Sequence, residues 1–303
     1  VVDSSGHLLA EARRRSHAAA EPEAVFAQTI QAVHEVLAGL NSSPQQLAGL
    51  GLAAPGELWV SEGLCVSCAD FPGWRDVPLT APFSEEFHLP VSLLSTTQAA
   101  ALAELCFGAA QGLSDLLFVS IGSDIDAALI LGGQPLSLPH ISSGQAGHMV
   151  IEAGGPTCSC GESGCWKALA GRDALLARVI KAVRSGSPTA IAAAADNRLA
   201  AITPALIVRM ASAGDAVARG ALEETGHYLA IGLANLVALL GPQAVIVDSV
   251  PSSVGAALLQ AAEATLKSSP RARLLSHCVL LPPELGEAAP LLGAAAWAAR
   301  CVV

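Results

Sequence analysis

Apolar residues recur along the chain at two different spacings. Between residues 21 and 40 they stand at positions 25, 26, 30, 33, 36 and 37, which is one face of a helix. Further helices are expected at 96–110, 252–269 and 288–300 and over most of 171–240. Buried strands are expected at 1–14 (two around the Ser4-Ser5-Gly6 turn), 47–58, 90–95, 116–136 (two around a turn), 244–249 and 278–282. Because strands and helices alternate, the pattern predicts an α/β fold with mixed sheets.

Composition narrows the class of protein. The 303 residues are 52% hydrophobic and 14% charged, which indicates a globular chain long enough for two lobes. The apolar stretch 227–247 contains Gly241 and Pro242, so it predicts a buried helix running into a strand and not a membrane span. The basic cluster near the start follows the apolar residues instead of preceding them, so no secretory signal is expected. We therefore expect a cytoplasmic protein. A net charge of −10 argues against nucleic-acid binding by this chain alone.

One histidine and three cysteines lie in the run GHMVIEAGGPTCSCGESGC. Nine, one and four residues separate His148, Cys158, Cys160 and Cys165 in turn. The intervening glycines allow tight turns, and four nitrogen and sulfur ligands are what structural zinc prefers. Because no ligand position is left for water, the run predicts a structural zinc site with these four ligands. The alternatives are a structural histidine among unrelated thiols, or a Cys160–Cys165 disulfide.

The other cysteines predict less. Cys65 and Cys68 form a CxxC pair, but the chain has no second CxxC pair to complete a four-cysteine site. We expect a structural role for them, and a metal or redox role is the alternative. Cys106, Cys278 and Cys301 sit in apolar runs and are expected in the core. Trp166 is likewise expected to pack in the core and not to line a cleft.

Five further segments accompany the cysteine-rich run. They are LGLAAPGEL (50–58), ADFPGWRDVPL (69–79), the strand and helix of 89–112, LANLVALLGPQAVIV (233–247) and APLLGAAAWAA (289–299). Together with GH…CxCGxxGC, they resemble the ROK family of repressors, uncharacterised reading frames and sugar kinases. The resemblance implies an actin-like ATPase (ribonuclease H-like) two-lobe fold. It places the first lobe at 1–96, completed by helix 288–303, and the second lobe with the zinc run at 97–287.

The resemblance also shows where kinase chemistry would reside. The family's Asn-Asp pair, whose Asp is the catalytic base, aligns with Ser95 and Thr96. The GTGIG-type phosphate turn aligns with residues 122–126, where Asp124 and Asp126 replace glycines. These carboxylates would repel phosphate. We expect them in a solvated turn, and the alternative is that they hold magnesium. The nucleotide Gly-Gly-Gly turn aligns with residues 248–250, and the Asp-x-Gly-x-Thr loop would precede Val1. We therefore expect no phosphoryl transfer.

The resemblance places the sugar site at matching positions. Asp70 stands where the family usually has Asn, Gln145 and His148 where it has the Glu and His of GExGH, and Lys167 where it has Glu. With Ser95 and Thr96, these are the expected ligand-binding residues. The gain of a cation at Lys167 favours an anionic ligand such as a sugar phosphate or sugar acid, and the alternative is a cleft that binds nothing.

Three functions follow from the resemblance. The favoured one is the effector-sensing and dimerisation region of a ROK-type transcriptional regulator that responds to a sugar or sugar phosphate and has no kinase activity. Its expected ligand is a carbohydrate effector, and it is expected to form a homodimer or homotetramer. DNA would be contacted only through an N-terminal winged helix outside this chain, and no membrane association is expected. A glucokinase-like sugar kinase and a catalytically dead binding protein are the alternatives.

Overall fold

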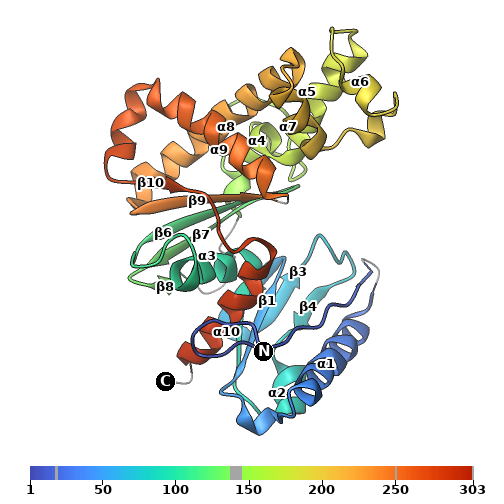
Figure 1. Cartoon of the computed structure of the whole chain (residues 1–303), viewed down its shortest axis with the longest axis vertical. Helices are drawn as coiled ribbons and strands as arrows, with labels where there is room; N and C mark the ends of the chain where they lie inside the picture. The colour runs from blue at the N-terminus through green and yellow to red at the C-terminus, as the bar shows by residue number, and fades with distance from the viewer. Residues whose placement is uncertain (18–19, 137–144, 250, 302–303) are drawn as a thin grey trace. The chain divides into compact units, whose positions relative to one another are not determined.

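The computed structural model describes residues 1–17, 20–136, 145–249 and 251–301. The chain forms two compact units (Figure 1). The first comprises Val1–Ser114, Ala128–Ser143 and Glu284–Val303, and the second comprises Asp115–Ala127 and Gly144–Pro283. The lobe limits expected from the family resemblance, 1–96 with 288–303 and 97–287, are not tested by this division and stay a prediction. The α/β class itself is confirmed by the strands and helices of both units.

The first unit contains two small sheets and four α-helices. Strands β1 and β5 are parallel, with Leu50 opposite Val91, and β2, β3 and β4 form an antiparallel sheet. The bounds are β1 Leu50–Ala54, β2 Glu57–Trp59, β3 Leu64–Ser67, β4 Arg75–Pro78, β5 Val91–Ser95, α1 Pro22–Gly39, α2 Ala81–Phe87, α3 Thr96–Phe107 and α10 Ala289–Cys301. At the N-terminus, a single antiparallel bridge joins Val2 and Leu8 where two strands were expected.

An aromatic cluster forms part of the core of the first unit. The ring of Phe26 on α1 meets Trp74 edge-on, with 5.9 Å between ring centroids. Cys65 and Cys68 are buried in the same core, which supports their structural interpretation. Burial, with the nearby Cys68 and Glu57, raises the pKa of Cys65 to about 11, so this thiol stays protonated at neutral pH.

Helix α10 closes the first unit against α3 and β1. A side chain at Gly293 would overlap the carbonyl oxygen of Ala99, so the two helices approach as closely as their backbones allow. The carboxylate of Glu104 on α3 is fully buried and accepts hydrogen bonds from the backbone N–H groups of Ala109, Glu284 and Leu285, each at 2.9 Å. A buried carboxylate with three donors is well compensated, and here it ties α3 to the segment that leads into α10.

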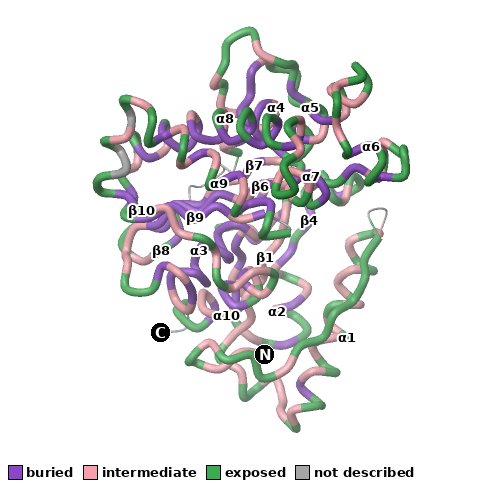
Figure 2. The backbone as a smooth tube through the Cα atoms, turned by 45° about the horizontal axis from the view of Figure 1, so that its top comes forward, coloured by how far each residue is buried: buried purple, intermediate pink, exposed green. Residues whose placement is uncertain are grey.

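A five-stranded sheet has the order β10-β9-β6-β7-β8, and its strands β6, β9 and β10 belong to the second unit. Strands β10, β9 and β6 are parallel, and β7 passes from the second unit into the first. Figure 2 shows β6 and β9 as nearly continuous buried segments, as expected for central parallel strands. The bounds are β6 Leu116–Ile121, β7 Ile125–Leu131, β8 Gln134–Pro135, β9 Ala244–Ser249 and β10 Val279–Leu281.

The second unit also contains helices that pack against one another and, through α9, against β9. They are α4 Trp166–Ala170, α5 Arg172–Arg184, α6 Ile191–Ala194, α7 Pro204–Ser212, α8 Ala216–Leu240 and α9 Ser252–Lys267. Helix α8 ends at Gly241 in the left-handed conformation, and β9 follows, as the sequence predicted for residues 227–247. None of the helices among the described residues combines the length and the apolar character that crossing a membrane requires.

Candidate metal centre and ligand site

The ligand atoms of His148, Cys158, Cys160 and Cys165 converge in the second unit. All four lie within 4.8 Å of one another. The Sγ of Cys158 is 3.7 Å from Nδ1 of His148, and the Sγ atoms of Cys160 and Cys165 are 3.7 Å apart. A tetrahedron with Zn–S bonds of about 2.3 Å has S–S edges of about 3.8 Å, so the donor set matches the geometry of a bound zinc ion. The predicted four ligands are thus together, and their cysteines are free thiols.

Glycine makes the fold of this loop possible. Gly164 has a φ of 80°, and a side chain there would overlap the carbonyl oxygen of Glu152. The two arms of the loop are held together by backbone hydrogen bonds: Ile151 donates to Gly164 at 2.9 Å, and Cys158 donates to Glu162 at 2.7 Å. The cysteines are therefore brought to one point by the backbone as well as by any bound ion.

The thiols of this cluster influence one another's protonation. Burial and the neighbouring Cys160 and Cys158 thiols raise the pKa of Cys165 to about 12. Burial also acts to raise the pKa of Cys158, but hydrogen bonds from the Cys160 backbone and from neighbouring side chains lower it overall. Crowded thiols resist losing their protons together, and a divalent cation is the group that would stabilise them as thiolates.

Trp166 anchors the loop to the core of the second unit. Its side chain is fully buried, and its Nε1 donates a 3.0 Å hydrogen bond to the carbonyl of Tyr228 on α8. Gly232, one turn further along α8, leaves the space that the indole occupies. The expectation that Trp166 packs in the core is confirmed. Cys165 of the cluster is the N-cap of α4, and the next residue, Trp166, is the one that contacts α8. Two consecutive residues therefore connect the cluster to α8.

Lys167 is already paired with a carboxylate. Its Nζ donates to Oδ2 of Asp124 at 2.6 Å, and the side chain is 14% exposed. Burial acts against the charge of Lys167, but the hydrogen bond and charge of Asp124 raise its pKa overall. Oδ1 of Asp124 accepts from the backbone N–H of Ile125 at 2.8 Å. One oxygen of the Asp124 carboxylate is thus paired with Lys167, a contact that the sequence did not suggest.

The turn that contains Asp124 lies at the carboxyl ends of parallel strands. Ser120 of β6 stands in register with Asp248, the last residue but one of β9, and the Gly122–Asp124 turn follows the end of β6. Gly147, between Gln145 and His148, packs against this turn, because a side chain there would come within 2.7 Å of the Asp124 carboxylate. Gln145 itself is exposed, and His148 is half-buried.

The remaining predicted ligand residues belong to the first unit. The hydroxyl of Ser95 accepts a 3.1 Å hydrogen bond from the backbone N–H of Gln98, and Oε1 of Gln98 accepts from the N–H of Ser95. This reciprocal capping box begins α3. Thr96 is half-buried in the first turn of the same helix, and Asp70 is exposed in the loop before β4. The sequence signal for the cap, Ser-x-x-Gln before an apolar helix, was present but was not used.

Comparisons with known proteins agree with this architecture. The model of the ROK family matches residues 1–301. The xylose repressor of Bacillus subtilis (strain 168) is 29% identical over 272 residues, which cover 90% of this chain and 66% of the repressor. The glucokinase of Halalkalibacterium halodurans (strain ATCC BAA-125 / DSM 18197 / FERM 7344 / JCM 9153 / C-125) is 29% identical over 230 residues, covering 76% of this chain and 69% of the enzyme.

A solved structure extends the agreement to three dimensions. The ROK family glucokinase from Streptomyces griseus, solved with glucose and AMPPNP, superposes with a TM-score of 0.81 at 25% identity, over 99% of this chain and 94% of the enzyme. The expected actin-like sugar-kinase fold is confirmed. Because the ROK family model matches residues 1–301, and both repressors and kinases are among the relatives, the chain belongs to the ROK family.

Proposed function

We propose that this chain is the effector-sensing and dimerisation region of a ROK-family transcriptional regulator, that it binds a neutral sugar, and that it has no kinase activity. The observation that carries the proposal is the Lys167–Asp124 pair in the turn where the family holds phosphate. The chain spans 66% of the length of the Bacillus xylose repressor, so DNA binding by the whole protein is part of the proposal and not a property of these residues.

The two strand ends of the second unit disfavour a nucleotide polyphosphate. Asp124 follows the end of β6, and Asp248 lies in the last two residues of the neighbouring strand β9, where phosphate-binding turns are expected to offer backbone N–H groups. Lys167 is already paired with Asp124, so its charge is not available to a phosphate group. A phosphate in this turn would have to displace the ion pair, and two unit charges 4 Å apart interact by about 4 kcal/mol at an effective dielectric constant of about 20. Kinases of this kind need the opposite arrangement, with cations and N–H donors around the transferred phosphate.

The first unit provides no carboxylate at the position of the family's base. Thr96 begins α3, and Ser95 is engaged as its cap. A neutral hydroxyl group is far too weak a base at neutral pH to accept a proton from a sugar hydroxyl, so neither residue is suited to be a general base. Both residues still offer hydroxyl oxygens, which suit a binding role.

The ligand is proposed to be neutral because Lys167 supplies no free charge. The sequence favoured an anionic ligand on the strength of this lysine, and its pairing with Asp124 at 2.6 Å removes that argument. Gln145, Ser95 and Thr96 offer neutral polar groups, and His148 would use one ring nitrogen for zinc and turn the other toward the ligand. We propose zinc as a structural ion that holds the Cys158–Cys165 loop and thereby His148.

Further features of the proposal rest on family resemblance. The winged helix that contacts DNA would precede Val1, the protein would act as a homodimer or homotetramer, and it would be cytoplasmic. The relationship to the xylose repressor supports the regulatory role. The relationship to glucokinases supports the competing function of a sugar kinase.

The test combines ligand binding with an activity assay. The zinc-loaded chain is screened by thermal shift and calorimetry against D-xylose, D-glucose, their phosphates and magnesium ATP. A ligand at 100 times its dissociation constant adds about 2.7 kcal/mol of stability, which a thermal shift detects readily. We expect a shift with a neutral sugar and none with ATP.

The activity arm separates the regulator from the kinase. Phosphorylation of the same sugars is followed with ATP, and a turnover of about 1 per second or more, the range of kinases, would establish the competing function. The Thr96→Asp variant is the control for the base: restored activity in it would show that the phosphate turns are functional and would contradict the proposal. Absence of a shift with every ligand would favour a binding protein without a sugar effector.

A further inference from the structure

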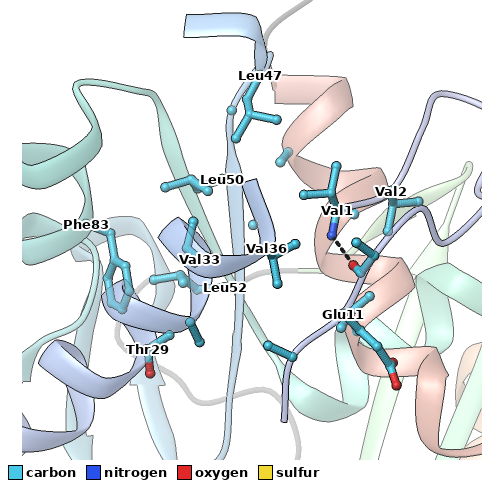
Figure 3. A pocket seen from close by; sticks show the side chains of 18 of the residues that line it. Val1, Val2, Glu11, Thr29, Val33, Val36, Leu47, Leu50, Leu52 and Phe83 are labelled. Atoms are coloured by element: carbon cyan, nitrogen blue, oxygen red, sulfur yellow. Dashed lines mark hydrogen bonds between the residues drawn. The ribbon is translucent and has the colours of Figure 1, made fainter. Parts of the chain in front are cut away.

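Reactive side chains gather in the metal loop of the second unit and not in the apolar cavity of the first. That cavity has a volume of about 390 Å³, and Figure 3 shows aliphatic side chains such as Val33, Leu50 and Leu52 around it. Its lining residues include no cysteine and no histidine, and Glu11 is the one charged side chain among them. The metal loop, in contrast, brings three thiols and an imidazole to one point.

Cys160 is an exposed thiol with a second thiol beside it. Its Sγ lies 3.7 Å from the Sγ of Cys165, which is fully buried. Cys301 is exposed as well, but it ends α10 and lies outside the metal cluster. An accessible sulfur with a neighbouring thiol is the arrangement in which oxidation ends in a disulfide, because the second thiol condenses with the sulfenic acid formed at the first.

The two sulfur atoms differ in how firmly the surrounding chain holds them. Cys165 is the N-cap of α4, and the next residue, Trp166, is fully buried. Cys160 is followed by Gly161, which has a φ of 94° and open space where a side chain would stand. A disulfide has an S–S bond of about 2.05 Å, so the Cys160 sulfur has to move by about 1.7 Å toward Cys165. Rotation of an exposed side chain between its staggered positions moves a sulfur atom that far.

We propose that Cys160 and Cys165 form a reversible disulfide when the protein reacts with hydrogen peroxide, and that this bond empties the metal site. The sulfur of Cys160 attacks one peroxide oxygen, the O–O bond breaks, and a sulfenic acid and water form. The sulfur of Cys165 then attacks the sulfenic acid sulfur, and the hydroxyl group leaves as water with the proton of that thiol. The two thiols lose two electrons and two protons, and one peroxide becomes two waters. A dithiol reverses the oxidation by exchange.

The disulfide removes two of the four donor atoms of the cluster. His148 and Cys158 remain, with Nδ1 and Sγ 3.7 Å apart. A structural zinc ion uses four protein ligands, so these two do not retain it. The metal release rests on the structural zinc site of the proposed function, whereas the disulfide needs the thiols alone. Neither step depends on whether the protein senses a sugar.

The second unit is expected to stay folded in the oxidised state. The hydrogen bonds from Ile151 to Gly164 and from Cys158 to Glu162 join backbone atoms only. The indole of Trp166 is held by α8 through a hydrogen bond that involves none of the thiols. The oxidised protein is therefore a folded, metal-free state, distinct from a denatured one.

The experiment follows the metal and the thiols in the same sample. The zinc-loaded chain is treated with increasing amounts of hydrogen peroxide, released zinc is measured with a chromogenic chelator, and disulfides are located by peptide mass spectrometry without reduction. We expect one zinc ion to be lost for each Cys160–Cys165 disulfide formed, and dithiothreitol with added zinc to restore the bound metal. Zinc loss without this disulfide, or oxidation of Cys160 to a sulfinic acid in its place, would overturn the proposal. A chain that binds no zinc is still expected to form the disulfide, so failure of the zinc site is distinguished from failure of the proposal.

Two variants serve as matched controls, and far-UV circular dichroism shows that each is folded. Cys301→Ser removes the other exposed thiol and should leave zinc release and the disulfide unchanged. Cys160→Ser should leave Cys158 and Cys165 reduced at the peroxide dose that oxidises the unmodified chain, because both of these thiols are buried. A Cys158–Cys165 disulfide that forms as readily in this variant would show that the exposure of Cys160 does not direct the chemistry, and the proposal would be wrong.

Discussion

Lys167 donates a hydrogen bond of 2.6 Å to Asp124, a residue that stands 43 positions earlier in the chain. The pair joins the helix that follows the last cysteine of the metal cluster to the turn between β6 and β7. The turn at Asp124, which aligns with the family's phosphate turn, is thereby held by the helix that follows Cys165. The pair therefore has consequences for stability as well as for ligand choice.

Removing either partner of this pair is expected to destabilise the second unit. In a double-mutant cycle of Lys167→Met and Asp124→Asn, a partly buried charged pair of this kind should show a coupling of about 1 kcal/mol. The free energies of unfolding are measured with urea. The exposed pair Lys267–Glu263 is the matched control and should couple by less than about 0.5 kcal/mol, since solvent screens it. Strict additivity at Lys167 and Asp124 would show that the pair is incidental.

The metal cluster is expected to bind one zinc ion per chain with a clear effect on stability. Chelation should lower the melting temperature, and Cys165→Ser should abolish stoichiometric zinc in elemental analysis. Cys301→Ser removes an exposed thiol outside the cluster and should leave both readouts unchanged. Equal zinc content in the two variants would contradict the assignment.

Two glycines of α8 are expected to respond oppositely to the same substitution. At Gly232 an added methyl group would overlap the indole of Trp166, whereas Gly220 has open space around it. Gly232→Ala should therefore cost about 1–3 kcal/mol through overpacking. Gly220→Ala should stabilise the protein by about 0.5–1 kcal/mol through helix propensity. The melting temperatures of the two variants test this prediction. A similar change in both would mean that Trp166 moves aside to make room for the added methyl group.

Asp215 is expected to make stability depend on pH. It caps α8 by accepting the N–H of Ala218 at 3.0 Å, and its other oxygen accepts from Thr189 and Ala190. Burial acts to raise the pKa of this carboxyl, but these hydrogen bonds lower it overall. Its contribution is therefore fully present above the unfolded pKa of about 3.9 and is lost as the pH falls through the lower folded value.

Two variants isolate this cap. Asp215→Ala should cost about 1 kcal/mol at pH 7, and Asp215→Asn less, because the amide retains an oxygen acceptor. Unfolding is followed at pH 7 and again below pH 4. A loss in Asp215→Ala that stays the same at both values would show that ionisation of the carboxyl has no part in capping.

Local sequence patterns predicted the elements that depend on local chemistry. The helical period gave α1, and Gly241 followed by an apolar run gave the passage from α8 to β9. The convergence of His148 with Cys158, Cys160 and Cys165 was also predictable, because thiol and imidazole groups at short spacing leave few alternatives. The antiparallel sheet of β2, β3 and β4 was missed, since its short strands lack a clear alternation of apolar and polar residues.

Contacts between distant residues were beyond the reach of the sequence. Nothing near Lys167 indicates that its charge meets Asp124, and nothing near Glu104 indicates the two N–H groups that it accepts from residues 284 and 285. Cys301, expected in the core, is exposed because it stands at the end of α10. In each case the outcome depends on which surfaces meet after folding.

The burial of Glu104 by residues 284 and 285, together with the close packing of α10 on α3, bears on how the protein is made. Helix α3 and strand β1 are synthesised long before α10, the helix that packs against them. Domains commonly fold as units from the N-terminus during synthesis. Here the first unit reaches its final packing only after residues 284–301 have been synthesised, so its apolar surfaces are available to chaperones while the whole second unit emerges from the ribosome.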